Sequence, residues 1–175
     1  HLSIQSNAHI KFMLSGETQN HFLVGSDSGY GFIIKFSDFL TNFKNGKAVI
    51  NLKTNHQLLP PDKVVDLASD TIAAVTTAGR LLIFTLDQLP NLKKGQGNKI
   101  ISIPGEKIGQ TNSEKLKFLK ILPLNSNLVI HSGRHFLKLN PGNQKNYTGR
   151  RGHRGKKLPR GYQNVNNVEI LPIEP

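Results

Sequence analysis

Short apolar runs, separated by small polar residues and a glycine, recur along this chain at a regular spacing. Residues 22–36 can be placed over residues 72–84, which puts Gly29 on Gly79, about fifty positions later. Each copy contains an apolar run, a few polar residues, the glycine and a second apolar run. A period of this length, built of short runs and glycine turns, is typical of propeller-like repeats.

Two further matches extend the repeat. Residues 46–52 resemble residues 97–103, and a third, looser copy begins at residues 128–137, where Gly133 takes the place of Gly79. One such unit cannot bury its own apolar face, so the units must pack side by side. We predict an all-β, propeller-like fold of about three copies in a single domain over residues 1–175, with approximate repeats 9–58, 59–112 and 115–175.

The apolar runs predict strands, because they are about five residues long, rich in Val, Ile, Leu and Phe, and bounded by turn residues. Residues 26–29 predict the tight turn of a hairpin, since a glycine takes a positive φ without steric cost. Short helical turns are expected at residues 37–40 and 87–89. Residues 10–14 are expected to be a strand that opens the first unit, and residues 2–4 to be left over from an earlier one. An ordinary β-sandwich with coincidentally similar hairpins is the alternative.

The composition excludes several kinds of site. The 175 residues include no cysteine, which excludes disulfides, thiolate chemistry and cysteine-ligated zinc. No apolar run approaches the roughly twenty residues that a membrane-spanning helix needs. The chain starts at His1 rather than Met, and we expect it to be part of a longer protein.

The net charge of +12 belongs to the last third of the chain. Residues 115–168 contain no Asp or Glu but hold twelve Lys and Arg, whereas basic and acidic residues balance elsewhere. Such asymmetry predicts a polyanionic partner. We favour nucleic acid over an acidic membrane, because the sequence lacks a basic amphipathic helix with an aromatic face.

The densest basic cluster, residues 149–161, predicts a loop because it contains four glycines and a proline. Glycines let the backbone approach a phosphate, and arginine can contact phosphate with two parallel hydrogen bonds. Residues 44–47 and 93–99 take the same place in the first two copies, so three basic loops are expected to line one rim that follows a DNA backbone. The alternative is a solvated loop without a specific partner. The predicted DNA-binding residues are Arg150, Arg151, Arg154, Lys156, Lys157, Arg160, Lys44, Lys47, Lys93, Lys94, Lys99 and Arg134.

No enzymatic site is indicated. His131 and His135 are four residues apart, but they belong to a strand pattern without the Glu of a zinc-protease helix. The sequence has no Gly-x-x-x-x-Gly-Lys-Ser/Thr loop, and we expect no ATP, metal or other cofactor to bind this chain. Because no aromatic residue is interleaved with the basic loop, binding is expected to follow the duplex backbone with weak sequence specificity. The aromatic residues are instead expected in the core: Phe32, Phe36, Phe84 and Phe136.

Four segments carry a resemblance to a known family: residues 25–32, 77–84, 92–101 and 148–152. They resemble the C-terminal domains of bacterial type IIA DNA topoisomerase A subunits, and the resemblance keeps its order over residues 10–170. It implies a β-pinwheel, a propeller-like ring of four-stranded blades that exchange strands with their neighbours and carry DNA along a basic outer edge. With three copies, this chain is expected to form a partial or open ring.

Within this family, the sequence resembles topoisomerase IV more than gyrase. The gyrase A chain carries a fuller basic glycine-rich box in its first blade, whereas residues 150–156 resemble that box loosely and lie in the last copy. The resemblance implies a non-catalytic, duplex-DNA-binding domain from the A subunit of topoisomerase IV, which binds and bends DNA to guide decatenation and supercoil relaxation by the holoenzyme. A gyrase-like DNA-wrapping domain and a propeller for protein interaction are the alternatives.

The family's catalytic tyrosine lies in a domain that this chain does not match, and we expect no catalytic role for Tyr30, Tyr147 or Tyr162. For the intact protein, the resemblance implies a heterotetramer of two A subunits with the B subunits of topoisomerase IV. It implies ATP on the B subunits and Mg²⁺ in the holoenzyme. It also implies a cytoplasmic location on the bacterial chromosome, with peripheral association with the inner membrane left open.

Overall fold

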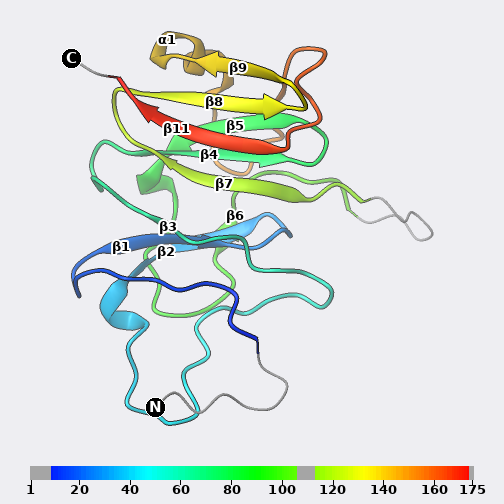
Figure 1. Ribbon diagram of the computed structural model, residues 1–175. Helices are drawn as coiled ribbons and strands as arrows, with labels where there is room; N and C mark the ends of the chain where they lie inside the picture. The colour runs from blue at the N-terminus through cyan, green and yellow to red at the C-terminus, as the bar shows by residue number, and fades with distance from the viewer. Residues whose placement is uncertain (1–8, 106–112, 174–175) are drawn as a thin grey trace.

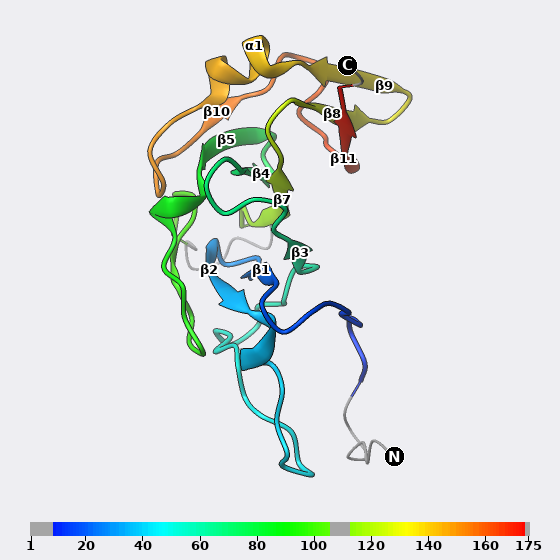
Figure 2. The ribbon, with the colours of Figure 1, turned by 90° about the vertical axis from the view of Figure 1, so that its left-hand side faces the viewer.

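Three antiparallel β-sheets, stacked one above another, make up the part of the chain that the structure describes (Figure 1). This computed structural model describes residues 9–105 and 113–173. The all-β prediction is confirmed. Among the described residues, the sheets follow one another in a curved row that does not close into a ring, which agrees with the expected partial or open ring (Figure 2). The remnant expected at residues 2–4 lies outside the described residues.

Each sheet is built around a hairpin. The first has the strand order β3-β1-β2-β6, the second β10-β5-β4-β7 and the third β11-β8-β9, so two sheets have the predicted four strands and the third has three. The strands of the first sheet are β1 (His21–Gly25), β2 (Tyr30–Lys35), β3 (Asp62–Lys63) and β6 (Asn98–Lys99). Those of the second are β4 (Thr71–Thr76), β5 (Arg80–Thr85), β7 (Leu116–Leu122) and β10 (Lys156–Lys157). Those of the third are β8 (Ser126–Ser132), β9 (His135–Leu139) and β11 (Asn167–Pro172).

The short helical turns follow the hairpins, as predicted. The 3₁₀ turns η1 (Phe36–Asp38) and η2 (Leu86–Gln88) come directly after β2 and β5. After β9 the chain forms one turn of α-helix, α1 (Pro141–Gln144), and then η3 (Lys145–Tyr147). Within residues 9–105 and 113–173, no helix has both the length and the apolar character that crossing a membrane would require.

The aligned glycines have equivalent conformations. Gly29, Gly79 and Gly133 all turn their hairpins with a positive φ, of 83°, 68° and 61°. Residues without a β-carbon adopt this region freely, whereas other residues are strained there. The repeat seen in the sequence therefore corresponds to the same turn in all three hairpins.

Strands from later in the chain complete the first two sheets. In the first sheet, β6 pairs with β2 and places Lys99 opposite Tyr30. In the second, β10 pairs with β5 and places Lys157 opposite Arg80. Strands β3 and β7 add to the other sides of β1 and β4 in the same way. Each of the first two hairpins is thus held by the following part of the chain, which is the strand exchange that the resemblance implied.

Hydrophobic layers lie between and beneath the sheets. Alternate residues of β4 face opposite layers: Ile72 and Ala74 pack toward the first sheet, and Ala73 and Val75 toward the third. Both faces of such a strand are buried, which explains its continuous apolar sequence. A third, smaller cluster covers the outer face of the first sheet. Its buried residues are Phe22, Val24, Phe32 and Ile34.

Two local expectations are wrong. Residues 10–14 form no strand, although β3, β7 and β11 hold the equivalent place in the repeat. Those three strands pair with the first strand of an earlier hairpin, and the described residues before β1 offer none. Phe136 is also not in the core: the residue is 63% exposed, because β9 is an edge strand with only β8 beside it.

Candidate nucleic-acid interface

Three basic glycine-containing segments follow one another along one side of the molecule (Figure 2). We call this surface the rim and define it as residues 44–51, 93–102 and 149–160. Backbone hydrogen bonds join its parts in order. The Asn51 N–H donates to the Gly95 carbonyl (2.9 Å), and the Gly152 N–H donates to the Ile100 carbonyl (2.8 Å). The first loop is thereby fixed to the second, and the second to the third.

The third loop of the rim, residues 149–160, depends on glycine where it passes closest to the second sheet. Gly155 has φ of 73°, and a β-carbon there would lie 3.0 Å from the Leu81 carbonyl oxygen. Gly152 also has a positive φ, of 81°. The loop continues into β10, so the prediction of a loop over residues 149–161 is right except at Lys156 and Lys157, which are paired in a sheet.

Two arginines of this loop point back into the protein. The Arg151 guanidinium donates to the Lys99 carbonyl oxygen (2.6 Å), and the Arg151 backbone N–H donates to the Gln88 side chain (2.8 Å). Arg154 donates to the Ser102 carbonyl oxygen (3.3 Å). It also forms a two-pronged ion pair with Glu114, in which Nη1 lies 2.9 Å from Oε1. These side chains join the loop to the second repeat.

Four other basic side chains of the loop face solvent. They have no hydrogen bond or ion pair to any other residue that the structure describes, so their cationic groups are available to an anion. They are Arg150, Lys156, Lys157 and Arg160. Strand β10 presents Lys156 and Lys157 at the edge of the second sheet, because β10 pairs with β5 alone. The loop thus combines an inward pair of arginines with an outward set of cations.

The remaining predicted residues fall into two groups. Lys44, Lys93, Lys94 and Lys99 are exposed on the first two loops of the rim. Lys47 is also exposed, and its ammonium group donates to the Asp38 carbonyl oxygen (2.8 Å). Arg134 lies in the turn between β8 and β9, apart from the three loops (Figure 2). The fold therefore does not bring Arg134 together with the other predicted residues.

The ionisation of Glu114 reflects its cationic neighbours. Burial alone would raise the pKa of Glu114, but hydrogen bonds from Arg154 and Thr76 and the charges of Arg154 and Arg80 outweigh it and lower the pKa. Arg80 itself donates to the Gly155 carbonyl oxygen (3.0 Å). One carboxylate and two guanidinium groups therefore meet behind the third loop, and the carboxylate stays ionised near neutral pH.

Sequence reasoning missed three residues that lie beside the rim. Glu114 and Arg80 are distant from the loop in sequence and meet it only through the exchange of strands. Lys53 was also not predicted. Its ammonium group lies 4.5 Å from the centre of the Tyr30 ring. Lys53 and Lys99 line the same hollow. A cation above an aromatic ring is stabilised by the ring's negative face. The repeat alignment could have indicated Lys53, because it follows the first basic loop directly.

Two histidines, His131 and His56, lie beside carboxylates. The Nε2 atom of His131 lies 2.8 Å from the Glu169 carboxylate, which β11 brings alongside β8. Nothing in the local sequence indicates a carboxylate near His131, since Glu169 is 38 residues away. The Nδ1 atom of His56 lies 2.7 Å from Asp27. Among residues 9–105 and 113–173, no group of three or more His, Asp and Glu side chains could hold a metal ion.

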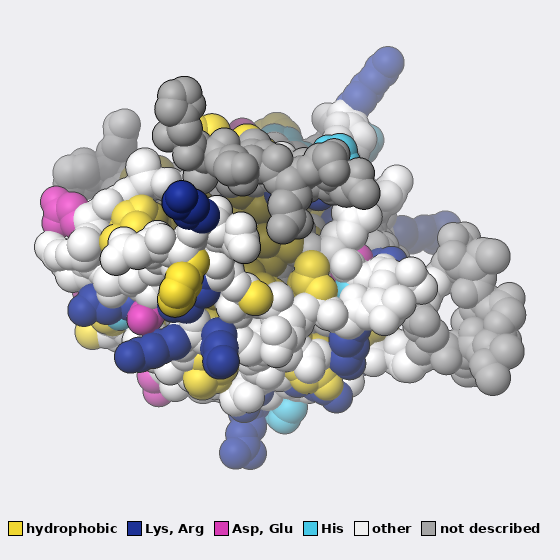
Figure 3. Space-filling view, turned by 90° about the horizontal axis from the view of Figure 1, so that it is seen from below, with side chains coloured by type: hydrophobic (Ala, Val, Ile, Leu, Met, Phe, Trp, Pro, Cys, Tyr) yellow, Lys and Arg dark blue, Asp and Glu magenta, His cyan; other side chains and the backbone are white. Residues whose placement is uncertain are grey.

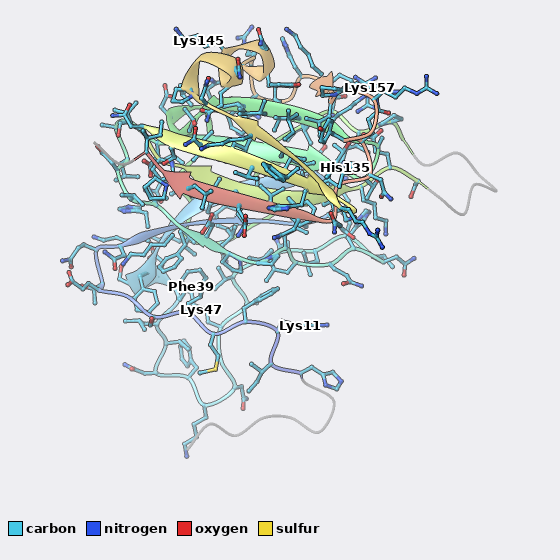
Figure 4. All side chains as sticks on the ribbon, turned by 45° about the horizontal axis from the view of Figure 1, so that its top comes forward. Lys11, Phe39, Lys47, His135, Lys145 and Lys157 are labelled. Carbon is cyan, nitrogen blue, oxygen red and sulfur yellow. The ribbon has the colours of Figure 1, made fainter. Side chains whose placement is uncertain are left out.

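The basic side chains are spread over the length of the molecule. Lys145 follows the third sheet and Lys157 lies on β10 of the second sheet, both in the upper part of the view, whereas Lys47 lies lower, near Phe39 (Figure 4). Seen from below, Lys and Arg side chains lie among hydrophobic ones on the same face (Figure 3). The molecule therefore offers both an extended basic rim and, at the first sheet, some exposed apolar surface.

Comparison with known proteins identifies the repeat. The family described as the DNA gyrase C-terminal domain, beta-propeller, matches residues 20–68 and 70–108, about half of the chain. The A subunit of DNA topoisomerase 4 from Pseudomonas aeruginosa is 44% identical over 154 residues, which are 88% of this chain and 20% of that protein. The corresponding Escherichia coli K12 protein is 41% identical over 169 residues, 97% of this chain and 22% of that protein. The chain thus spans about a fifth of the length of these relatives.

Solved structures agree in fold. The E. coli ParC C-terminal domain superposes with a TM-score of 0.87 at 40% identity, covering 98% of this chain and 69% of that one. The DNA gyrase A C-terminal domain gives a TM-score of 0.66 at 18% identity, over 89% of this chain and 50% of that one, and supports the fold alone. The prediction of a pinwheel with a topoisomerase-type repeat is confirmed. The chain belongs to the family of DNA gyrase C-terminal, beta-propeller domains.

Proposed function

We propose that this chain binds duplex DNA through its phosphate backbone, with the double helix lying along the rim. The observation that supports this most directly is the outward set of Arg150, Lys156, Lys157 and Arg160, whose side chains have no partner among the described residues. Phosphate contacts from Lys and Arg supply most of the affinity of sequence-independent DNA binding. The two lysine-bearing loops beside this set extend the same charge along the rim.

In the intact protein, we propose a non-catalytic role that positions DNA for a topoisomerase. The relatives at 41–44% identity are named as A subunits of DNA topoisomerase 4, and this chain corresponds to about a fifth of each. Binding and bending DNA beside the rest of the enzyme would influence which DNA crossings it resolves. We also propose that the intact protein assembles with a second A subunit and with the B subunits. ATP would bind the B subunits, and the holoenzyme would use Mg²⁺. Its location would be cytoplasmic and associated with the chromosome. A gyrase-like wrapping role is the less favoured form of the same function.

A second candidate function, protein interaction, is favoured by the apolar side chains exposed near the first sheet. Met13 is 90% exposed and Phe43 is 77% exposed. Exposed apolar patches commonly mark contacts with other protein surfaces. Met13 lies outside the rim, but Phe43 adjoins Lys44 and lines a hollow with Lys47, so a protein partner there would cover the first loop of the rim.

Protection of lysines from acetylation tests the proposal that DNA lies on the rim. The chain would be treated with a low dose of an acetylating reagent, with and without a mixed-sequence duplex, and each lysine would be read by mass spectrometry. DNA on the rim should protect Lys156 and Lys157 and leave Lys63, on β3, unchanged. If saturating duplex does not reduce the labelling of Lys156 and Lys157 relative to their labelling without DNA, the proposal is overturned.

A further inference from the structure

We propose that Glu114 is a positioning residue for DNA binding: its carboxylate holds Arg154 and thereby fixes the third loop in the conformation that directs Arg150, Lys156 and Lys157 outward. This inference rests on the proposed function, since it concerns the same rim. According to this proposal, the acidic residue Glu114 strengthens the binding of DNA, although its negative charge alone would weaken it.

The contacts of Arg154 place the ion pair at the centre of the loop. Arg154 lies between Gly152 and Gly155, the two residues with positive φ, where the backbone has the greatest freedom to rearrange. Its guanidinium reaches Glu114 with two nitrogen atoms, and one of these also donates to the Ser102 carbonyl oxygen (3.3 Å). A two-pronged arginine–carboxylate contact fixes orientation as well as distance.

Glu114 is suited to this role by its burial. Its side chain is 10% exposed, whereas that of Arg154 is 35% exposed, so the carboxylate forms the inner and more rigid side of the pair. Arg80 lies behind the same loop and donates to the Gly155 carbonyl oxygen (3.0 Å). Without the carboxylate, Arg80 and Arg154 would be two like charges in a partly buried space, and their repulsion would push the loop away from the second sheet.

Two effects of Glu114 on DNA binding therefore oppose each other. Its negative charge repels phosphate, but the positive charges of Arg154 and Arg80 beside it offset that charge. Its hold on Arg154 orders the loop before DNA binds and so reduces the conformational entropy that binding costs. Backbone hydrogen bonds hold the loop at Gly152 and His153, and the ion pair is the contact that fixes the Arg154 side chain between the two flexible glycines. The second effect is therefore the larger.

The test compares the Glu114→Gln chain with Glu169→Gln, a control that removes a carboxylate from β11, away from the rim. Amide hydrogen exchange of residues 149–158 is measured without DNA, and affinity is measured for a mixed-sequence duplex. We expect Glu114→Gln to accelerate exchange in this segment by about tenfold and to weaken DNA binding by about threefold to tenfold, which is about 0.7 to 1.4 kcal/mol. Glu169→Gln should leave exchange there unchanged and should not weaken binding.

The two readouts separate failure of this inference from failure of the proposed function. Unchanged exchange in Glu114→Gln would overturn the positioning role, whatever the affinity does. Faster exchange with stronger DNA binding would also overturn it, because charge would then dominate. If the unaltered chain does not bind duplex DNA, the proposed function fails and so does the inference that rests on it. Arg154→Gln provides a second variant in which the ion pair is removed from the other side, and the same two changes are expected.

Discussion

The Arg151 guanidinium donates a hydrogen bond of 2.6 Å to the Lys99 carbonyl oxygen, which joins the third loop of the rim to the second. Both residues belong to the set that the sequence predicts to contact DNA. In the structure, one side chain of this pair serves the fold, while the other remains exposed. The basic residues of the rim should therefore separate into two classes by experiment.

Replacing the inward arginines should reduce stability. Arg151→Ala removes the hydrogen bond to a backbone carbonyl and leaves that acceptor without its donor, which costs about 1 kcal/mol. For a chain of this size, such a loss lowers the melting temperature by about 2–4 °C. Thermal unfolding followed by circular dichroism checks this, and Arg150→Ala on the neighbouring exposed residue is the matched control. Equal melting temperatures for the two variants would contradict the division into classes.

Replacing the outward cations should weaken DNA binding with little effect on folding. We expect the triple variant Arg150→Ala, Lys156→Ala, Lys157→Ala to bind DNA with a weaker salt dependence. The slope of log K against log salt should become less negative by about 0.9 for each phosphate that is no longer bound. Exposed charges contribute little to the free energy of unfolding, so the melting temperature should hardly change. The control is a triple variant of equal charge at Lys11, Lys63 and Lys120. An equal loss of affinity in both variants would mean that only net charge matters.

The first two loops should contribute less than the third. Replacing Lys44, Lys47, Lys93 and Lys94 by Ala removes four charges, but they are divided between two loops that carry no arginine. Arginine contacts phosphate through two nitrogen atoms, whereas lysine acts as a point charge. Gel shifts at low salt should therefore show a smaller loss than in the triple variant of the third loop. A larger loss would place the DNA on the part of the rim nearest the first sheet.

Gly97 tests the close packing between repeats. A β-carbon at Gly97 would lie 2.1 Å from the Gly31 carbonyl oxygen, and φ is 79°. Gly97→Ala should therefore lower the free energy of unfolding by about 2 kcal/mol or more, because steric overlap adds to the backbone strain. At Gly46, φ is 76° but nothing lies within 4 Å of the added atom. Gly46→Ala should cost only the backbone strain, about 1 kcal/mol. Similar losses for the two variants in urea unfolding would contradict the packing.

The stability contributed by Glu114 should depend on pH. Its pKa in the folded protein is below its ordinary value of 4.5, so its contribution is present above pH 4.5 and is lost as the pH falls through the folded value. The difference in melting temperature between the unaltered chain and Glu114→Gln should therefore be constant from about pH 7 to about pH 5 and shrink below pH 4.5. A difference that stays constant as the pH falls below 4.5 would mean that the carboxylate charge is not what stabilises the pair.

The repeats and the hairpins could be predicted from the sequence because they depend on local order. A five-residue apolar run, a turn glycine and a second run determine a hairpin wherever it occurs, and Gly29 and Gly79 do so in the same way. The limits of the three repeats and the assignment of the chain to one domain stay predictions. The outer strands could not be found locally, because β6 and β10 are two residues long and are strands only where an earlier hairpin offers an edge.

The division of the basic residues could not be predicted for the same reason. Arg151 and Arg150 are adjacent and have the same chemistry, and only the position of Lys99 distinguishes their roles. Glu114 directly precedes the stretch of residues 115–168 that contains no acidic residue, and nothing in the sequence near it indicates Arg154 as its partner. Strand exchange places Glu114 beside Arg154, which is 40 residues further along the chain. Phe136 was misplaced because an edge strand and a central strand have the same apolar pattern.

Salt dependence of DNA binding tests the central claim most directly. Affinities of the unaltered chain for two unrelated duplexes would be measured by fluorescence anisotropy across a range of salt concentrations. If about five phosphates are bound, log K should fall linearly with log salt with a slope near about −4 to −5. The two duplexes should agree within about tenfold, or about 1.4 kcal/mol. A flat response to salt, or a strong preference for one duplex, would contradict binding through the phosphate backbone.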